Sequence, residues 1–361
     1  MPDEIFELFH VAPPGLEQVL AAELQDKGFV DPVPSPGGVT TKGPLSDVMR
    51  ANLDIRGSAR VLLRIAGFRA MHLAQLDKRA RKVDWAAIMR PDAPIHVEAT
   101  CRKSRIYHNR AASERISKAI NETLGCPIDA DAAIRIKARI DDDFCTISVD
   151  TSGNALHKRG LKGAMGKAPL RENLAALCLR ACGFNGTETV VDPMSGSGTF
   201  VIEAAEIARG LTPGRARAFA FDDLAIGANK TISDAGETPF NFYGFDRDAG
   251  AVKSATDNAL RAGVADNTSF TCQPLTDLRP PEGPPGLVMI NPPYGGRIGN
   301  KKMLYGLYGA IGQVMRDHFA GWRMGLVTSE PSLAKACGLD WADVIGPFPN
   351  GGIRVSLYHW K

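Results

Sequence analysis

The sequence predicts an α/β protein: a doubly wound, largely parallel sheet with an antiparallel edge, preceded by two smaller α+β modules. Its 361 residues correspond to two or three domains at roughly 100–200 residues each. From residue 169 onward, short apolar runs alternate with helical segments, as expected for a sheet covered on both faces. Before that point, short strand and helix signals follow one another closely, and a basic, glycine-rich stretch separates the two halves.

The two N-terminal modules are expected over residues 1–55 and 56–155. In the first, the pattern predicts a strand over 6–12, a helix over 16–27, a turn rich in Pro and Gly over 32–37, and a helix near Leu45. In the second, it predicts strands over 59–70, 95–100, 133–140 and 144–149 and helices over 72–81 and 113–124.

Residues 156–168, which include KRGLKGAMGK, are expected to form a linker to the C-terminal domain, residues 169–361. The strands predicted there cover 189–191, 242–245, 269–272, 287–290 and 324–327. Residues 353–360 alternate between apolar and polar side chains, which predicts an edge strand that pairs near Val344. The polar segment 210–239 is interpreted as an insertion.

Charge is unevenly distributed, although the formal net charge is only +3. Residues 1–55 hold 3 Lys/Arg against 9 Asp/Glu, whereas residues 56–118 hold 15 against 5. Basic side chains interleaved with rings suit phosphate contacts and base stacking. A solvated helix face is the alternative for the cluster near residue 80, whereas the cluster near residue 105 is expected in a strand-to-helix connection. The predicted RNA-binding residues are Arg79, Arg81, Lys82, Arg102, Lys103, Arg105, Tyr107 and Arg110.

Several classes of protein are excluded or disfavoured. No apolar run approaches the roughly 20 residues that span a bilayer, and the N-terminus lacks the pattern of a signal peptide. We therefore expect a cytoplasmic protein without a membrane partner. The seven cysteines form no C-x-x-C pair and the seven histidines no paired spacing, so no metal site is expected.

A glycine-containing turn in DPMSGSGT predicts a cofactor site. Gly196 and Gly198 permit a tight turn and let a ligand approach the backbone at a helix N-terminus. The third small residue of the dinucleotide fingerprint is replaced by Val201, and Asp192 would repel a pyrophosphate. The turn therefore favours a cationic ligand such as S-adenosylmethionine over a nicotinamide cofactor.

Carboxylates that follow the next two predicted strands can complete such a site. Asp246 is placed to accept hydrogen bonds from the ribose hydroxyls. Asp248 is expected to cap the following helix instead. Asp277 is placed to accept the adenine amino group, with a surface turn as the alternative.

The segment LVMINPPYGGRIG predicts the reactive centre. Its buried strand leads into Asn291, Pro292, Pro293 and Tyr294, and the prolines stiffen the turn. The lone pair of an exocyclic base amine is delocalised into the ring, so two acceptors are needed to orient it toward a methyl donor. The Asn291 side-chain oxygen and the Pro292 carbonyl can serve, and Tyr294 can stack on a flipped base. The alternative is a proline-bent strand end with a packed tyrosine.

DPMSGSGT together with NPPY resembles the amino-methyltransferase signature of class I S-adenosylmethionine enzymes. HKRGLKGAMGKAPLRENLAALCL, GFDRDAGAVKSATDNALRAG, LYGLYGAIGQVMRDHFAGW and NGGIRVSLYHW extend the resemblance to the bacterial RlmL-type family over essentially the whole chain. The resemblance implies a ferredoxin-like unit and a THUMP RNA-binding domain before a Rossmann-like class I methyltransferase domain. It also implies methylation of guanine N2 in large-subunit (23S) ribosomal RNA.

Residue roles follow from the same resemblance. The NPPY residues 291–294 would be catalytic, and residues 170–173 would lie near the methionine end of the cofactor. The implied cofactor contacts are Asp192, Pro193, Met194, Gly196, Gly198, Asp246, Asp277 and Asn291. Some members carry a second methyltransferase domain, and this sequence stops at Lys361, so a single activity is expected.

Other functions remain open at this point. The NPPY motif recognises an amine rather than a particular base, so a tRNA guanine-N2 or an adenine-N6 methyltransferase is an alternative. A catalytically idle RNA-binding or ribosome-assembly protein is the alternative from another class, and an oxidoreductase is a third. The sequence indicates no general base.

Overall fold

The structure is a computed structural model that describes residues 5–161, 170–226, 232, 235–294 and 301–361. The chain divides into two compact units. The first contains Met1–Ala12, Ala21–Leu156 and Arg217–Thr231, and the second contains Pro13–Leu20, His157–Ala216 and Ile232–Lys361. Each unit is built on one seven-stranded sheet.

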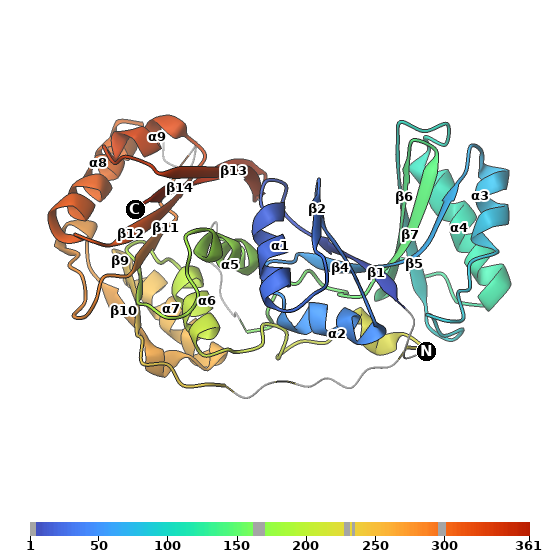
Figure 1. Ribbon diagram of the computed structural model, residues 1–361, viewed down its shortest axis with the longest axis horizontal. Helices are drawn as coiled ribbons and strands as arrows, with labels where there is room; N and C mark the ends of the chain where they lie inside the picture. The colour runs from blue at the N-terminus through green and yellow to red at the C-terminus, as the bar shows by residue number, and fades with distance from the viewer. Residues whose placement is uncertain (1–4, 162–169, 227–231, 233–234, 295–300) are drawn as a thin grey trace. The chain divides into compact units, whose positions relative to one another are not determined.

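The sheet of the first unit has the strand order β2-β3-β1-β4-β7-β6-β5. Its strands are β1 (Phe6–Val11), β2 (Val33–Ser35), β3 (Gly38–Gly43), β4 (Arg60–Arg69), β5 (Ile95–Arg102), β6 (Ile134–Asp141) and β7 (Phe144–Asp150). The helices in this part of the sequence are α1 (Glu17–Asp26), α2 (Leu45–Asp54), α3 (Leu73–Ala80) and α4 (Asn109–Leu124). Figure 1 shows α3 and α4 side by side against one face of the strands β5 to β7.

The predicted turn over residues 32–37 is wrong in extent, because β2 and β3 form a hairpin there and β3 pairs antiparallel with β1. Pro34 hides the strand pattern, and proline is tolerated because β2 lies at the edge of the sheet. Gly38 is required by the close pairing, since a Cβ there would lie 2.4 Å from the carbonyl oxygen of His10. The helix predicted over 113–124 also begins earlier, at Asn109.

One strand joins the two predicted N-terminal modules. β4 pairs antiparallel with β1 on one side and with β7 on the other. A bulge between Arg64 and Ala66 shifts its register with β7, and such bulges bend a strand. The boundary at residue 55 stays a prediction, since a continuous sheet spans both modules. Of the predicted linker 156–168, residues 162–168 lie outside the described residues.

Part of the predicted insertion 210–239 folds into the first unit. The short helix η1 (Ala220–Asp223) is held by the Phe221 N–H, which donates to the Thr151 carbonyl at 3.0 Å. Phe219 and Phe221 are buried and their rings stack with centroids 5.0 Å apart. This stretch is thus a core element of that unit.

The sheet of the second unit has the order β10-β9-β8-β11-β12-β14-β13. Its strands are β8 (Val190–Asp192), β9 (Phe242–Asp246), β10 (Thr268–Cys272), β11 (Leu287–Ile290), β12 (Arg323–Thr328), β13 (Asp343–Asn350) and β14 (Ile353–Trp360). The helical elements are α5 (Glu172–Ala181), α6 (Thr199–Ala208), α7 (Ala249–Ala262), η2 (Ala265–Asn267), η3 (Leu275–Asp277), α8 (Lys301–His318) and α9 (Pro331–Ala336).

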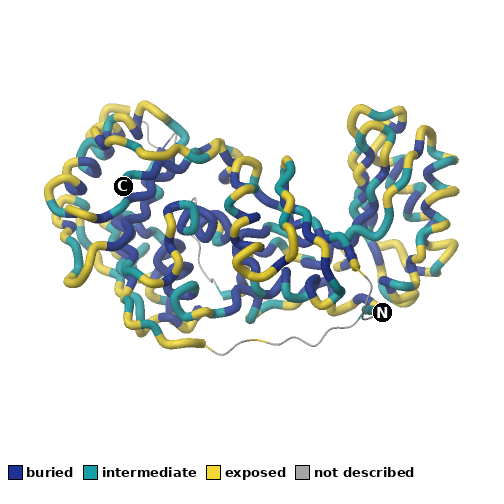
Figure 2. Tube along the Cα trace, in the orientation of Figure 1, coloured by how far each residue is buried: buried dark blue, intermediate teal, exposed yellow. Residues whose placement is uncertain are grey.

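Five of these strands are parallel, and β14 pairs antiparallel with both β12 and β13. The predicted doubly wound sheet with an antiparallel edge is therefore confirmed. The central strands β8 and β11 are buried throughout, which explains their continuous apolar sequence (Figure 2).

Candidate functional site

The strand order of the second unit brings the carboxyl ends of β9, β8 and β11 together. In such sheets, ligands bind beyond the carboxyl ends of the strands where the chain order reverses, here between β8 and β11. A cavity of about 570 Å³ lies at this place, within the usual range of ligand pockets. Its lining residues are Pro193, Met194, Asp246, Arg247, Gln273, Pro274, Leu275, Asn291, Pro293, Met303, Leu304 and Leu307.

The glycine turn has the geometry that the sequence predicts. Gly196 and Gly198 have φ angles of +51° and +84°. A Cβ on Gly198 would lie 3.0 Å from the Phe270 ring, so the turn packs closely against β10. A Cβ on Gly196 would meet nothing within 4 Å, which leaves the backbone there open to a ligand. Gly198 also precedes the first residue of α6, whose N-terminus faces this turn.

Asp246 connects the turn to the next strand. Its Oδ2 accepts a hydrogen bond from the Gly196 N–H at 2.9 Å, and its Oδ1 accepts from the Asp248 N–H at 3.0 Å. Each carboxylate oxygen has a second lone pair, so Asp246 can still accept from ligand hydroxyls at the cavity it lines. Asp248 caps α7 through the Gly250 N–H at 2.8 Å, as predicted.

Asp192 ends β8 and is 2% exposed. Burial and, to a smaller extent, the neighbouring Asp246 charge raise the pKa of its carboxyl to about 8, against the opposing effect of the Met194 N–H hydrogen bond. The raised pKa means that the hydrogen bonds of the ionised carboxylate do not offset the cost of burying its charge. A cationic ligand nearby would favour the ionised form, whereas a pyrophosphate would oppose it.

Asn291 follows β11 at the wall of the cavity. Its Oδ1 is buried and accepts no hydrogen bond from any residue that the structure describes. An unsatisfied buried acceptor costs about 1–3 kcal/mol, and a ligand N–H can supply the missing donor. This atom is therefore the clearest sign that the cavity takes a ligand with a hydrogen-bond donor.

The NPPY segment, residues 291–294, is contacted by Tyr308 of α8, which in turn contacts Thr328 of β12. The buried Tyr308 hydroxyl lies 3.4 Å from the Pro293 carbonyl oxygen and 3.1 Å from Thr328 Oγ1. The Thr328 oxygen also accepts from the Glu330 N–H at 3.3 Å. These contacts fit a chain in which Thr328 donates to Tyr308 and Tyr308 donates to Pro293. Sequence reasoning missed Tyr308, since its contact depends on tertiary packing.

Tyr294 is only 3% exposed, and its hydroxyl accepts a hydrogen bond from Asn350 Nδ2 at 3.0 Å. The ring is therefore packed in the protein interior, and its stacking on a base stays a prediction. Sequence reasoning also missed Asn350. The only signal is the NGG triplet, which is typical of a tight hairpin turn.

Asp277 and the predicted residues near the methionine end are not among the residues that line the cavity. Asp277 is exposed on η3, two residues after Leu275, which lines the cavity. Leu170 and Asn173 are buried near the beginning of α5.

The predicted RNA-binding residues fall into two groups at opposite ends of the paired helices α3 and α4. Arg105 Nη1 lies 3.1 Å from Met71 Sδ, just before α3 begins. Arg81, just after α3 ends, forms ion pairs with Asp77 and with Glu122 near the end of α4. The two groups therefore do not form one patch. Exposed members are Arg79, Lys82, Arg102, Lys103, Arg105, Tyr107 and Arg110.

Within the described part of the chain, no three or more His, Cys, Asp or Glu side chains cluster in a way that could hold a metal ion. Among the described helices, none combines the length and apolar character needed to cross a membrane.

Three family models match successive parts of the chain. The RlmL ferredoxin-like domain matches residues 7–62, the THUMP domain residues 70–150, and the RMKL-like methyltransferase domain residues 159–346. The chain is 34% identical over 384 residues to "Ribosomal RNA large subunit methyltransferase K/L" of Syntrophotalea carbinolica, covering 99% of this chain and 54% of that protein. The chain spans about half the length of the curated relatives it matches.

Solved structures agree with this fold. A protein from Listeria monocytogenes titled a predicted N6-adenine-specific DNA methylase superposes with a TM-score of 0.90 at 29% identity, covering 99% of this chain and 96% of that one. The SMU.472 protein, a candidate methyltransferase solved in complex with SAH, superposes with a TM-score of 0.86 at 26% identity, covering 99% and 98%.

Proposed function

The chain belongs to the RMKL-like methyltransferase family, and from this premise we propose that it is an S-adenosylmethionine-dependent RNA methyltransferase. We further propose the exocyclic N2 of a guanosine in large-subunit ribosomal RNA as the acceptor. The preceding RlmL ferredoxin-like and THUMP domains support RNA as the substrate, and the name of the Syntrophotalea carbinolica relative supports ribosomal RNA. Such a substrate corresponds to a cytoplasmic enzyme.

The cavity fits this cofactor on three observations. The turn at Gly196 leaves room at its backbone, Asp246 offers acceptors for hydroxyls, and Asp192 would be ionised more easily beside a positive charge. When bound, S-adenosylmethionine supplies an electrophilic methyl group. In this proposal the same three residues hold the cofactor, with Met194 and Leu275 along the apolar part of the cavity.

The single observation that carries the proposed chemistry is the buried Oδ1 of Asn291, which has no hydrogen-bond partner among the described residues. An exocyclic amine offers two N–H groups, of which one would donate to this oxygen and the other to the Pro292 carbonyl. These two bonds would orient the nitrogen lone pair toward the cofactor side of the cavity and stabilise the positive charge that develops on nitrogen. The contacts of Tyr308 and Asn350 hold the acceptors in place beforehand.

An amide cannot accept a proton at neutral pH, so Asn291 orients the amine and does not act as a base. The proton that the amine loses leaves to solvent in this proposal.

The test uses cofactor labelled in its methyl group with separated ribosomal RNA, tRNA and DNA, followed by nucleoside identification. We expect N2-methylguanosine in large-subunit ribosomal RNA. Label found as N6-methyladenine would support the alternative that the Listeria monocytogenes structure's title names. Absence of transfer to every nucleic acid, with RNA binding retained, would instead support an idle RNA-binding protein.

A further inference from the structure

The seven-stranded sheet of the first unit has one apolar face and one charged face. Side chains alternate along each strand, and β6 follows this rule, with Ile134, Ile136 and Ala138 buried and the residues between them more accessible. α4 packs against β5 with α3 beside it (Figure 1), and we take the buried set to lie on the face that these helices cover. The other set forms what we call the charged face, made by side chains of β1, β4, β5, β6 and β7.

The strand register places the residues of this face in rows across the sheet. One row runs from Glu7 through Arg64, the buried Ser148 and Lys137 to Glu98. A second row runs through Gly67, Thr146, Arg139 and Thr100, and a third through Arg69, Phe144, Asp141 and Arg102. Residues that are separated by up to about 140 positions in the sequence thus share one surface.

Basic side chains exceed carboxylates on the charged face. The basic residues are Arg64, Arg69, Arg102, Arg135, Lys137 and Arg139, and the carboxylates are Glu7, Glu98 and Asp141, besides the ion pair of Arg60 with the buried Asp150. The sequence conceals this surplus, because residues 119–164 hold 6 Lys/Arg against 7 Asp/Glu. The register places Arg135, Lys137 and Arg139 on one face, where Arg139 also pairs with Asp141 at 2.7 Å.

The cations of β6 are held in position. Arg135 and Lys137 both bind Glu98, at 2.8 and 2.6 Å. Burial opposes ionisation of Glu98, but its hydrogen bonds to Lys137 and Arg135 outweigh burial and lower its pKa to about 2. Two cations share this one carboxylate, so a positive charge remains. Alternate residues of a strand lie about 6.6 Å apart, a spacing comparable with that of successive phosphates along an extended nucleotide strand.

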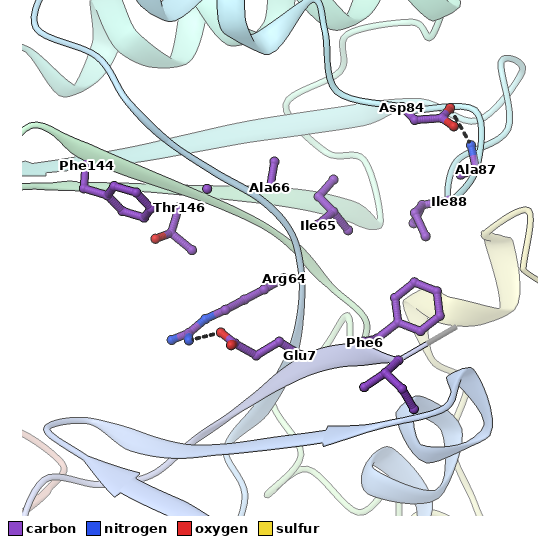
Figure 3. Close-up of a pocket in the computed structure, with 12 residues that line it drawn as sticks. Phe6, Glu7, Arg64, Ile65, Ala66, Asp84, Ala87, Ile88, Phe144 and Thr146 are labelled. Atoms are coloured by element: carbon purple, nitrogen blue, oxygen red, sulfur yellow. Dashed lines mark hydrogen bonds and ion pairs between the residues drawn. The ribbon is translucent and has the colours of Figure 1, made fainter. Parts of the chain in front are cut away.

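An exposed aromatic ring and a cavity lie on the same face. Phe144 is 44% exposed, and Gly67 beneath it leaves room for the ring, since a Cβ there would lie 2.9 Å from Phe144. The adjoining cavity of about 630 Å³ lies at the bulge of β4. Figure 3 shows Phe144 and Thr146 at one end of it, Phe6 and Ile88 at the other, and the ion pair of Arg64 with Glu7 between them.

The opposite, helical side is also basic but differs from the charged face in the position of its exposed aromatic ring. Arg81, Arg110 and Lys118 each pair with a carboxylate one helical turn away. Arg64 and Arg139 of the charged face are likewise paired, with Glu7 and Asp141, so local pairing does not distinguish the two sides. The exposed Tyr107 lies at one end of the helical side, whereas Phe144 lies in a row of the charged face.

We infer that the charged face binds a single-stranded segment of the RNA substrate, with phosphates along the β6 cations and a base stacked on Phe144 or entering the adjoining cavity. Cation rows beside an aromatic platform are how open sheets bind single strands, whereas helical RNA exposes no base face to stack on. This inference rests on the proposed function for the identity of the polymer. It places the RNA on the sheet and leaves the loops at the helix ends as secondary contacts.

The test measures binding of a labelled single-stranded RNA of about 16 nucleotides, and of the same RNA as a duplex, to the full chain. The face variants are Arg69→Gln/Arg139→Gln and Phe144→Ala. The matched control is Arg115→Gln/Lys118→Gln on α4, which removes the same charge from the helical side. Thermal unfolding of each variant shows that the fold is retained.

We expect the two-charge face variant to weaken single-strand binding about tenfold and to reduce the slope of log Kd against log salt by about 1.4, at about 0.7 for each phosphate. Phe144→Ala should weaken single-strand binding at least fivefold, in keeping with about 1–3 kcal/mol per stacked base, and leave duplex binding unchanged. The control should stay within about twofold of wild type. Equal losses in the control and the face variant, or no effect of Phe144→Ala, would overturn the inference.

Methyl transfer distinguishes the two proposals. If wild type labels ribosomal RNA but the face variants keep the wild-type KM for it, the inference fails and the proposed function stands. If wild type labels no RNA yet binds the single strand through Phe144, the proposed function fails and the surface stands.

Discussion

Asn350 Nδ2 donates a hydrogen bond to the Tyr294 hydroxyl at 3.0 Å, and so joins the last hairpin of the second unit to the NPPY segment. Gly351 and Gly352 follow with φ angles of +58° and +86°, and Asn350 pairs with Ile353, so a two-residue turn connects β13 to β14. Two consecutive left-handed residues match the twist of the strands, which explains the NGG sequence. The hairpin turn holds Asn350 in position, and the hydrogen bond from Asn350 holds the Tyr294 hydroxyl.

Replacing Asn350 should therefore affect catalysis more than cofactor binding. We expect Asn350→Ala to lower kcat about tenfold or more, because small displacements of the reacting groups are costly, with cofactor Kd changed less than twofold. Asn350→Asp should restore part of kcat, since a carboxylate can accept from the Tyr294 hydroxyl. Steady-state kinetics and calorimetric titration provide the two readouts.

A double-mutant cycle identifies the path of this effect. If Asn350 acts through the Tyr294 hydroxyl, Tyr294→Phe/Asn350→Ala should lose no more activity than the worse single variant. Asn185→Ala, on an exposed loop where Asn185 bonds only locally to Thr187, is the matched control and should behave as wild type. Additive losses would contradict the coupling.

Asn291→Ala should abolish methyl transfer while leaving cofactor affinity largely intact. The reason is that the unpartnered Oδ1 is assigned to the acceptor amine in our proposal and not to the cofactor. Single-turnover transfer and cofactor titration test the two halves separately. Loss of cofactor affinity would show that Asn291 serves cofactor binding instead.

Cofactor binding should strengthen with rising pH. With a pKa of about 8 in the free protein, the Asp192 carboxyl is largely protonated at pH 6, and a cationic ligand favours its ionised form. Affinity should therefore increase by up to tenfold per pH unit from pH 6 and level off above about pH 8. Asp192→Asn should weaken binding and remove this dependence. A flat wild-type profile would contradict the assignment.

Asp192 should also lower the stability of the folded protein at high pH. The pKa of Asp192 is raised in the folded state, so its contribution to stability is present at low pH and is lost as the pH rises through about 8. Without cofactor, Asp192→Asn should raise the thermal midpoint at pH 8 by a few degrees and have little effect at low pH. Calorimetry at the two pH values measures the difference.

The two glycines of the cofactor turn should respond differently to alanine. Gly198→Ala should destabilise the fold by about 1–3 kcal/mol, because its φ of +84° is strained for alanine and a Cβ would press on Phe270. Gly196→Ala should cost only about 1 kcal/mol, because its Cβ meets no atom. Its methyl group would instead occupy the open space beside the backbone, where the cofactor is proposed to bind, so cofactor affinity should fall more than stability. Urea unfolding and cofactor titration separate the two effects.

The sequence predicts the position of the glycine turn and of the NPPY segment because each lies directly after a buried apolar strand. Gly196, Asp246 and Asn291 are then brought together by a strand order that such sheets share. The packed position of Tyr294 and its partner Asn350, 56 residues away, depends on how a distant hairpin folds back. The charged face depends on register across five strands. Local pattern carries no information about either.

The position of β14 bears on how the protein matures during synthesis. Among the described strands this one comes last in chain order, yet it lies between β12 and β13 in the sheet. A growing polypeptide that has reached only Asn350 offers β13 no neighbour, and the edge of β12 is still unpaired. The hydrogen bond from Asn350 to Tyr294 is therefore fixed only after β14 has left the ribosome and has inserted between β12 and β13. Assembly of the proposed reactive centre is in this way delayed until β14 has been synthesised.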